Sequence, residues 1–420
     1  MPPIILSINA GSSSVKVSVF TTDTPLKQLA EIQVDGLTAP PAKLKYTRGD
    51  HKVRGDEIGK DIDSQESAFQ HILDYLEKDA GLPEISNRES IEWACHRVVH
   101  GGDYDEPKIL DSGTYNHIEE LSDLAPLHNA GALGLVKAVQ KLLPKATNVA
   151  FFDSAFHSSL PPHVRTYPIS PEIAQRNKLR KYGFHGLSYA FITGAVAAHL
   201  KKPQNELNII ALHLGSGASA CAIRSGKSLN TTMGLTPLAG LPGATRSGSV
   251  DPSLVFHYAH DAGRLAPKET SKLHITEAEL ILNKQSGWKA LTGTTDFGTI
   301  SQKAEEGDPV HKLAFDIFVD RVLQFVGSYY VALGGQVDAL VFAGGIGEKG
   351  VQLRRAVTEG AKCLGFELDH KKNEKPGDEG GDDRVTDIAS TSSKHRVLVC
   401  QTDEQLEMAR QCVAQFVGKS

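Results

Sequence analysis

Near its start the chain reads IILSINAGSSSVKVSVF, residues 4–20. The apolar runs 4–9 and 15–20 are predicted to form two strands joined by a turn of one glycine and three serines. The tip of such a hairpin offers backbone N–H groups, hydroxyls and the side chain of Asn9 to an anion. A Gly/Ser turn without a ligand has the same sequence, so one copy leaves both interpretations open.

The same pattern returns in the second half of the chain as NIIALHLGSGASACAI, residues 208–223. Aligning the two turns places His213 opposite Asn9 and Gly215 opposite Gly11. Two copies favour the anion-binding interpretation. They indicate two similar domains that face one phosphate-bearing ligand.

The composition is that of an ordinary globular protein. The 420 residues are 40% hydrophobic and 23% charged, which is enough for two or three domains with sizeable cores. Because 45 Lys and Arg stand against 50 Asp and Glu, the net charge is −5 and no basic surface calls for nucleic acid or an anionic membrane. We expect small-molecule partners.

The cysteines and the apolar runs predict a cytoplasmic protein. The five cysteines are scattered, odd in number and never in a C-x-x-C pair, as in reduced intracellular proteins. No stretch reaches the roughly 20 apolar residues of a membrane span.

Periodicity predicts regular elements along most of the chain. Residues 21–60 are polar, with breaks at Pro40-Pro41 and Gly49-Asp50, so we predict no long element there. Four prolines between residues 161 and 171 predict an extended crossover, and the first domain boundary is predicted near Asp153. The predicted helices are 64–78, 131–143, 311–333 and 403–417, and the predicted strands are 91–99, 148–152, 337–342 and 397–399.

The two common phosphate-binding motifs are absent from the sequence. Gly226-Lys227-Ser228 has the ending of a Walker A loop, but Cys221 occupies the position of its first glycine. The run Gly344-Gly345-Ile346-Gly347 lacks the Rossmann spacing, yet it follows a predicted strand and opens a helix, so a nucleotide could approach it closely. A simple packing turn is the alternative.

Two arginines are candidates for binding an anion. Arg97 lies in the apolar run HRVVHGG, residues 96–102, where burial of a cation is costly unless a carboxylate or a phosphate pairs with it. A structural salt bridge is the alternative. His96 and His100 lack a third metal ligand at sensible spacing. Arg246 lies among small residues that free its guanidinium to reach a ligand, or solvent.

Asp153 and His185 complete the candidate set. Asp153 follows a predicted strand directly, and His185 lies in YGFHG, residues 182–186, where glycines allow close approach of the backbone. Two arginines, two histidines, a carboxylate and two Gly/Ser hairpins fit phosphoryl transfer, which depends on positive charge and in-line positioning more than on covalent chemistry.

Several strings resemble the acetate kinase family. They follow the family's order and span residues 4–408: SINAGSSS at 7–14, HRVVHGG at 96–102, LAPLHN at 124–129, YGFHG at 182–186 and GGIGE at 344–348.

The resemblance implies an α/β fold with two duplicated ribonuclease-H-like domains of the actin and Hsp70 type and a nucleotide cleft between them. The first domain would comprise residues 1–153, completed by the C-terminal segment 395–420. The second, residues 154–394, would carry the nucleotide site and the interface of a homodimer.

The implied reaction is reversible transfer of the ATP γ-phosphoryl group to acetate, which gives acetyl phosphate and ADP with Mg²⁺. Since acetate is already a carboxylate at neutral pH, no strong general base is needed. Charge neutralisation and alignment must carry the catalysis.

The resemblance also implies a role for each site residue. Asn9 and His213 would contact phosphate, and Asn9 and Glu404 would position Mg²⁺. The catalytic residues would be Arg97 and Arg246, which hold the acetate and the transferring group, His185, which stabilises the transition state, and Asp153, which orients the acetate carboxyl. Further phosphate and nucleotide contacts would be Lys16, Gly215, Ser216, Gly217, Gly344, Gly345, Ile346, Gly347 and Glu348, and the pocket for the methyl group would be lined by Val99, Leu127, Phe184 and Pro237.

The chain departs from the family pattern at Ser216, where Asn is usual, Ser249 (Asp), Lys349 (Asn), Ala239 (Glu) and Ala130 (Pro). Several departures fall on the donor side, so a pyrophosphate- and phosphate-dependent acetate kinase stays an alternative.

Two further alternatives remain. A related short-chain acid could be the acceptor, since one methylene changes discrimination by only about 1–3 kcal/mol. A non-catalytic nucleotide-binding switch would have lost the acceptor-side charges, whereas Arg97, Asp153, His185 and Arg246 are all present.

Overall fold

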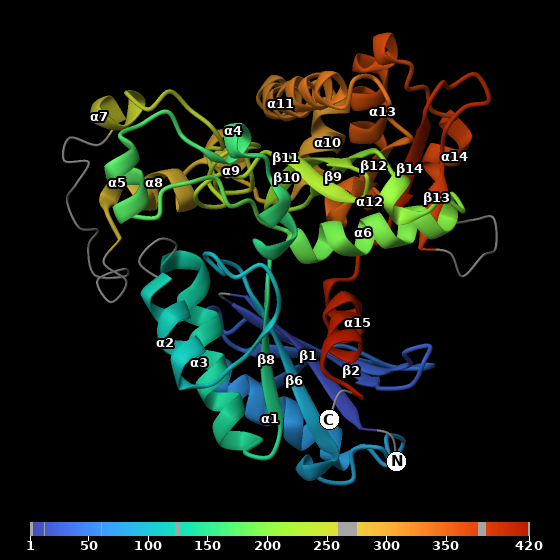
Figure 1. Cartoon of the computed structure of the whole chain (residues 1–420). Helices are drawn as coiled ribbons and strands as arrows, with labels where there is room; N and C mark the ends of the chain where they lie inside the picture. The colour runs from blue at the N-terminus through green and yellow to red at the C-terminus, as the bar shows by residue number, and fades with distance from the viewer. Residues whose placement is uncertain are drawn as a thin grey trace. The chain divides into compact units, whose positions relative to one another are not determined.

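The computed structural model describes residues 3–11, 13–59, 61–121, 126–258, 275–376 and 384–418 (Figure 1). The chain forms two compact units. Unit 1 comprises Met1–Ala155 and Asp403–Ser420, and unit 2 comprises Phe156–Thr402.

Unit 1 is built on a mixed sheet with the strand order β5-β4-β3-β2-β1-β6-β8-β7. Strand β1 pairs antiparallel with β2 and parallel with β6, and β6 pairs parallel with β8. The strands are β1 Ile4–Ala10, β2 Ser14–Thr21, β3 Gln28–Asp35, β4 Ala42–Arg48, β5 His51–Gly59, β6 Ile91–Val98, β7 Lys108–Ile109 and β8 Thr147–Phe152.

Helices cover both faces of this sheet, which explains why β1 is buried along nearly its whole length. Helices α1 and α3 pack on one face, and α15 packs across β1, β2 and β6 on the other (Figure 1). The helices described in unit 1 are α1 Gln65–Lys78, α2 Ser112–Leu121, α3 Pro126–Leu142 and α15 Glu404–Gln415, and a 3₁₀ turn lies at Arg88–Ser90.

Unit 2 has its own mixed sheet, with the order β11-β10-β9-β12-β14-β13. Strand β9 is antiparallel to β10 and parallel to β12, which is parallel to β14. The strands are β9 Ile209–Leu214, β10 Ala218–Arg224, β11 Lys227–Thr231, β12 Ala339–Ala343, β13 Val385–Asp387 and β14 Arg396–Cys400.

Helix α11 lies over one face of the unit 2 sheet and α6 over the other (Figure 1). The helices of this unit are α4 Pro162–Arg165, α5 Pro171–Arg176, α6 Gly186–His199, α7 Leu254–Tyr258, α8 Glu277–Lys284, α9 Gly287–Thr292, α10 Phe297–Glu305, α11 Pro309–Ala332, α12 Gly344–Lys349, α13 Val351–Gly360 and α14 His370–Glu374, and 3₁₀ turns lie at Ala155–Ser159, Gln204–Glu206 and Lys362–Leu364.

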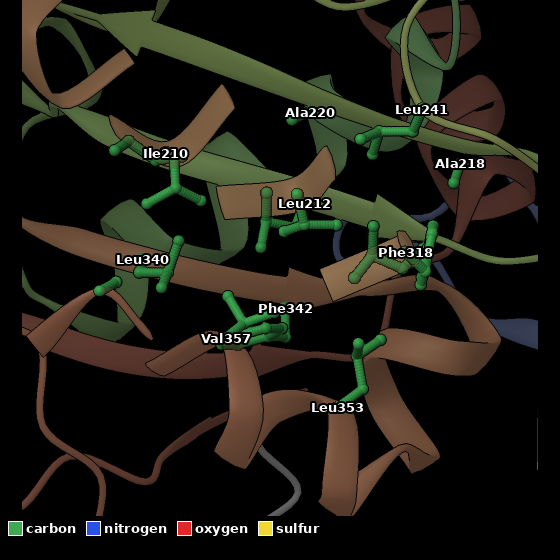
Figure 2. Close-up of a cluster of buried hydrophobic side chains, with 14 of the residues drawn as sticks. Ile210, Leu212, Ala218, Ala220, Leu241, Phe318, Leu340, Phe342, Leu353 and Val357 are labelled. Carbon is green, nitrogen blue, oxygen red and sulfur yellow. The ribbon is translucent and has the colours of Figure 1, made fainter. Parts of the chain in front are cut away.

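The core of unit 2 lies between its sheet and the helices α11 and α13. Figure 2 shows Leu212 and Phe342 from adjacent strands facing Phe318 of α11 and Val357 of α13, and all four side chains are fully buried. Burial of each side chain contributes roughly 1.5–3 kcal/mol. This packing fixes the strands whose carboxyl ends lead into the site residues.

The two sheets repeat one topology. The order β3-β2-β1-β6-β8 of unit 1 matches β11-β10-β9-β12-β14 of unit 2, with the same parallel and antiparallel pairings. The duplication predicted from the two hairpins is confirmed, and so is the α/β fold class. Because the units are defined by contacts, the predicted domains, as parts that fold on their own, remain a prediction.

Two expectations from the sequence were wrong. Residues 21–60, predicted to lack long elements, form β3, β4 and β5. Leu44 and Tyr46 of β4 point inward while Lys43 and Lys45 point outward, so this period-2 alternation next to the edge strand β5 outweighed the polar composition. The expected extended crossover at 161–171 instead holds α4 and the start of α5, because Pro at the first position of a helix is compatible with it.

None of the helices described in either unit combines the length and the apolarity needed to cross a bilayer.

Candidate functional site

In unit 1, Arg97 and Asp153 meet at the carboxyl ends of two parallel strands. Arg97 lies in β6, and Asp153 directly follows β8, the parallel neighbour of β6. The guanidinium donates to the carboxylate from Nε to Oδ1 at 3.1 Å and from Nη2 to Oδ2 at 2.7 Å. Asp153 is 1% exposed, whereas the side chain of Arg97 is 17% exposed. The salt bridge considered for Arg97 is present, and the guanidinium keeps further N–H groups for a second anion.

Two carboxylates stabilise the positive charge of Arg97. Burial opposes that charge, but Asp153 and Glu404 outweigh it and raise the pKa of Arg97 above its usual range. Glu404 lies in the first turn of α15, and the next residue, Gln405, donates from Nε2 to the backbone oxygen of Ser7 at 2.9 Å. This hydrogen bond fixes the start of α15 beside β1.

Asn9 and Glu404 supply oxygen donors from these neighbouring elements. Asn9 lies near the end of β1, two residues after the Ser7 oxygen that binds α15. Within the described ranges no group of three or more His, Cys, Asp and Glu side chains could hold a metal ion. Mg²⁺ uses one or two protein oxygens together with water and substrate phosphates, so this sparse donor set fits Mg²⁺.

The other candidates in unit 1 have the following positions. Lys16 of β2 forms an ion pair with Glu31, Nζ to Oε2 2.8 Å, and both side chains are at least a third exposed. Such a surface pair contributes about 0–1 kcal/mol, so Lys16 can exchange it for a phosphate. Val99 directly follows β6 and is partly buried. Leu127 lies in α3, but its side chain falls outside the described part of the chain.

In unit 2, two histidine rings lie against each other in a tilted arrangement, at the start of α6 and the end of β9. The ring centroids of His185 and His213 are 4.1 Å apart, at an interplanar angle of 33°. Each Nδ1 contacts a serine hydroxyl: that of His185 lies 2.9 Å from Ser219 Oγ, and that of His213 lies 2.8 Å from Ser188 Oγ. Both rings are therefore anchored by Nδ1.

His185 precedes α6 in the left-handed region, with φ 60°. This conformation costs a non-glycine residue on the order of 1 kcal/mol, and such strain concentrates at functional sites.

Arg246 lies against the tip of the second hairpin. The loop that carries it docks there through the N–H of Ala244, which donates to the Ser216 oxygen at 2.9 Å. A Cβ at Gly217 would collide with the Arg246 guanidinium and would lie 3.7 Å from His185 Nε2. Glycine leaves the space that Arg246 Nη2 occupies, and a larger residue would require the end of the arginine side chain to move. The structure thus brings together the predicted residues His185, Gly217 and Arg246.

The Arg246 guanidinium lacks an acceptor in the described ranges, since no carboxylate or carbonyl there receives a hydrogen bond or ion pair from it. Burial in the surrounding protein lowers the pKa of Arg246 to about 10. A cation that is desolvated without a protein partner favours binding of an anion.

Residues 344–348 form the start of α12, which is braced at both ends. Gly344 has φ +74°, and a Cβ there would lie 2.8 Å from the Leu214 oxygen at the end of β9. Glu348 Oε1 accepts from the N–H of Gly344 at 3.1 Å and from that of Thr402 at 3.3 Å. The fully buried Arg354 donates from Nη1 to the backbone oxygens of Gly347 and Glu348 at 2.9 and 2.7 Å.

A pocket of about 290 Å³ lies beside α12 and the hairpin tip, entirely within unit 2. Ser216, Gly345 and Ile346 all line this pocket, as the predicted nucleotide site requires. Ser216 and Lys349, two of the departures from the family pattern, are among the lining residues. The lining residues are Ser216, Thr295, Asp296, Phe297, Gly298, Ser301, Gly345, Ile346, Lys349, Gly350 and Gln352.

The remaining candidates in unit 2 support the backbone of the site. Phe184 and Pro237 are buried, and the Phe184 oxygen contacts His157 Nε2 at 3.0 Å. Ser249 pairs with Gly240 through two hydrogen bonds of 2.9 Å, which ties the ends of the Arg246 loop together. Whether Val99, Leu127, Phe184 and Pro237 line one methyl pocket stays a prediction.

Sequence reasoning missed three kinds of residue. It did not single out the hydroxyls that hold the histidines, those of Ser188 and Ser219, or the Arg354 brace. It also missed the pocket wall at 295–298, where only the helix-capping pattern of Asp296 gave a signal.

Comparison with known proteins decides the family. The model of the acetokinase family matches residues 4–410. The chain belongs to the acetokinase family. It is therefore an enzyme, a kinase.

Members of the family resemble the chain over nearly its whole length. A Neurospora crassa protein named "Probable acetate kinase" is 57% identical over 441 aligned residues, which cover 98% of this chain and 94% of the relative. A Francisella tularensis propionate kinase superposes with a TM-score of 0.84 at 34% identity, covering 97% of this chain and 98% of its own. A Porphyromonas gingivalis acetate kinase gives 0.82 at 32% identity, covering 98% and 99%.

The contact between Gly217 and Arg246 leads to a testable prediction for this enzyme. Gly217→Ala must push the guanidinium away from the hairpin tip, and a displacement of about 1 Å can lower turnover roughly 100-fold. We expect turnover to fall by at least this factor, with the far-ultraviolet circular dichroism spectrum unchanged. Steady-state kinetics measure the effect.

Gly194→Ala is the matched control, because a Cβ at this helical position meets no atom within 4 Å. It should retain wild-type turnover and gain slightly in thermal stability. Equal activity of the two variants would show that Arg246 does not depend on the space at Gly217.

Proposed function

We propose that this enzyme catalyses reversible, Mg²⁺-dependent transfer of the γ-phosphoryl group of ATP to acetate, which gives acetyl phosphate and ADP by direct in-line transfer. Membership of the acetokinase family supports this reaction. The observation that carries the proposal is the desolvated Arg246 guanidinium, which has no acceptor among the described residues and lies beside His185 at the Gly217 tip.

The positive charge of Arg246 places the binding site for the transferring phosphoryl group in unit 2 under this proposal. A phosphoryl group in transfer spreads negative charge over three equatorial oxygens and needs donors fixed in advance around them. The Arg246 guanidinium would supply such donors in unit 2. His185 and His213 are anchored by Nδ1, so each imidazole is oriented before substrate binds.

The acceptor side lies in unit 1. Acetate is a carboxylate, and Arg97 has N–H groups beyond those that bind Asp153. Asp153 fixes the guanidinium plane, so the carboxylate ligand meets a rigid fork rather than a mobile chain. No group needs to remove a proton from acetate, and orientation is therefore the main task.

Asn9 and Glu404 would hold Mg²⁺. When bound, Mg²⁺ would neutralise part of the phosphate charge. Lys16 would bind a phosphate oxygen in place of Glu31.

The pocket beside α12 supports ATP as the donor. Its volume of about 290 Å³ is near the lower end of the range for small-molecule sites, and Phe297 offers an aromatic ring. Pyrophosphate would not use such a pocket. Since Ser216 and Lys349 line it, the alternative donor is tested directly below.

The methyl pocket would accept acetate and, less well, propionate. Val99, Leu127, Phe184 and Pro237 are the proposed lining residues. One additional methylene changes discrimination by about 1–3 kcal/mol, so a related short-chain acid stays an alternative substrate.

Acetyl phosphate formation tests the function, with hydroxylamine to trap the product. We expect product from acetate, Mg²⁺ and ATP, and none with pyrophosphate or after chelation of Mg²⁺. Arg97→Lys should lower turnover at least 100-fold, because lysine keeps the charge but loses the two-pronged contact with Asp153.

Arg48→Lys is its control. Arg48 binds Asp79 with the same two-pronged geometry in the same unit, at 2.7 and 3.2 Å, and belongs to no proposed site. It should retain full activity. Product from pyrophosphate alone would overturn the nucleotide assignment, and nucleotide binding without any product would identify a non-catalytic switch.

The proposal extends to a homodimer formed through unit 2. Apolar side chains are exposed on α7, α9 and α11, and exposed clusters of this kind mark interfaces. Tyr258 and Leu291 also border an apolar pocket of about 240 Å³ that reaches Trp288. The exposed residues are Leu254, Phe256, Tyr258, Leu291, Val310 and Leu313.

Sedimentation velocity measures this assembly. We expect wild-type protein to sediment as a dimer and Leu313→Asp as a monomer, since a charge would be buried at the interface. Val331→Asp should stay dimeric, because Val331 is 76% exposed but lies about 30 Å along α11 from Val310. A monomeric wild type, or a dimeric Leu313→Asp, would contradict the proposed interface.

The proposal includes two further points. The predicted domains 1–153 with 395–420 and 154–394 would each fold as a unit, which limited proteolysis can test. Because the cysteines of the described residues are all free, a cytoplasmic location is proposed, and recovery of the enzyme in a secreted fraction would contradict it.

A further inference from the structure

We propose that Tyr189 and Ser219 act as positioning residues that hold His185 in the tautomer with its proton on Nε2. The inference rests on the proposed function for its catalytic meaning, but the tautomer itself is an independent property of the protein. It follows from the directions of two hydrogen bonds that meet at the buried Ser219 hydroxyl.

The first direction is set by Tyr189. This residue of α6 is fully buried, and its hydroxyl lies 2.5 Å from Ser219 Oγ. Among the described residues, Ser219 is the acceptor for the phenolic proton. Since an unpaired buried donor is costly, Tyr189 donates to Ser219.

The second direction is set by Ser219, which is also fully buried, on β10. Its hydroxyl has two hydrogen-bond partners in the described part of the chain, Tyr189 and His185 Nδ1 at 2.9 Å. Because Tyr189 uses an acceptor position of the serine oxygen, the serine proton must go to Nδ1. Were Nδ1 to donate instead, the serine proton would have no acceptor.

Nδ1 of His185 is then an acceptor, and the neutral ring carries its proton on Nε2. Nε2 lies 3.7 Å from the point where a Cβ on Gly217 would stand, next to the Arg246 guanidinium. The chain from Tyr189 through Ser219 therefore gives the hairpin tip an N–H donor. A developing negative charge on the phosphoryl group needs such a donor.

The hydrogen bonds of His213 differ from those of His185 in what fixes their direction. His213 Nδ1 contacts Ser188 Oγ at 2.8 Å, and Ser188 contacts Thr402 Oγ1 at 2.8 Å, where either hydroxyl can donate. Neither of these two hydrogen bonds involves a tyrosine hydroxyl that would fix its direction. The hydrogen bonds of Tyr189 and Ser219 therefore fix the proton position at His185, and the two hydroxyl contacts of Ser188 do not by themselves fix it at His213.

Nitrogen NMR of the full-length protein labelled with ¹⁵N-histidine reads the tautomer directly. The His185 resonances are assigned by their loss in His185→Gln. We expect a protonated Nε2 and an unprotonated Nδ1 for wild type. Ser219→Ala removes the donor to Nδ1 and should give a mixture of both tautomers, and Tyr189→Phe should shift the same resonances in the same direction.

Kinetics separate positioning from binding. Ser219→Ala should lower kcat about 10- to 100-fold, because the Nε2–H donor is present in only part of the molecules. KM for acetate and for ATP should change less than about twofold. Ser228→Ala is the control for the spectrum: Ser228 contacts Nδ1 of the buried His157 at 2.8 Å, so the His185 resonances should not move.

A wild-type spectrum with the proton on Nδ1 would overturn the proposal, even if no variant folds. So would an unchanged His185 tautomer in folded Ser219→Ala. The spectrum does not depend on turnover. If wild type shows the expected tautomer but forms no acetyl phosphate, the proposed function fails while the hydrogen-bond assignment stands.

Discussion

The approach of the Arg246 guanidinium to Gly217 is the contact on which the rest of the site depends. A Cβ at 217 would occupy the space of Arg246 Nη2, so any residue other than glycine there would displace the guanidinium. The described residues provide no acceptor for this cation, and burial lowers its pKa to about 10. The protein thus carries a desolvated positive charge that no group in the described ranges neutralises. In the proposed reaction an anionic substrate would neutralise this charge when it binds, and a group that gains negative charge during transfer would do so more strongly.

The remaining elements keep the surroundings of this charge rigid. Two neighbouring histidines are anchored by serines, so the orientation of each ring is set before substrate binds. Glu348 and Arg354 brace α12 at its two ends, beside the pocket proposed for ATP. In unit 1, Asp153 holds Arg97 by two hydrogen bonds. Preorganisation of this kind lets electrostatic stabilisation act without rearrangement at the moment of reaction.

The sequence predicted the duplicated fold because the hairpins at 4–20 and 208–223 are local and strongly patterned. It also named Arg97, Asp153, His185 and Arg246, since cations and polar residues stand out in apolar or glycine-rich surroundings. It could not predict the partners. Ser219 reaches His185 across 34 positions and Arg354 reaches Asn373 across 19, and an isolated serine or arginine in a helix or strand has many equivalent interpretations. The strands at 28–59 were missed because their outward faces are charged.

Comparison of two arginines of unit 2 tests the account most directly. Burial lowers the pKa of Arg354, like that of Arg246, to about 10, but Arg354 donates four hydrogen bonds to protein oxygens. Arg246→Gln should leave the free energy of unfolding unchanged or higher while turnover falls on the order of 1,000-fold. Arg354→Gln should lose several kcal/mol of stability, because it leaves buried oxygens without donors. If Arg246→Gln destabilises the protein as much as Arg354→Gln does, or retains wild-type turnover, the charge of Arg246 is not reserved for the substrate.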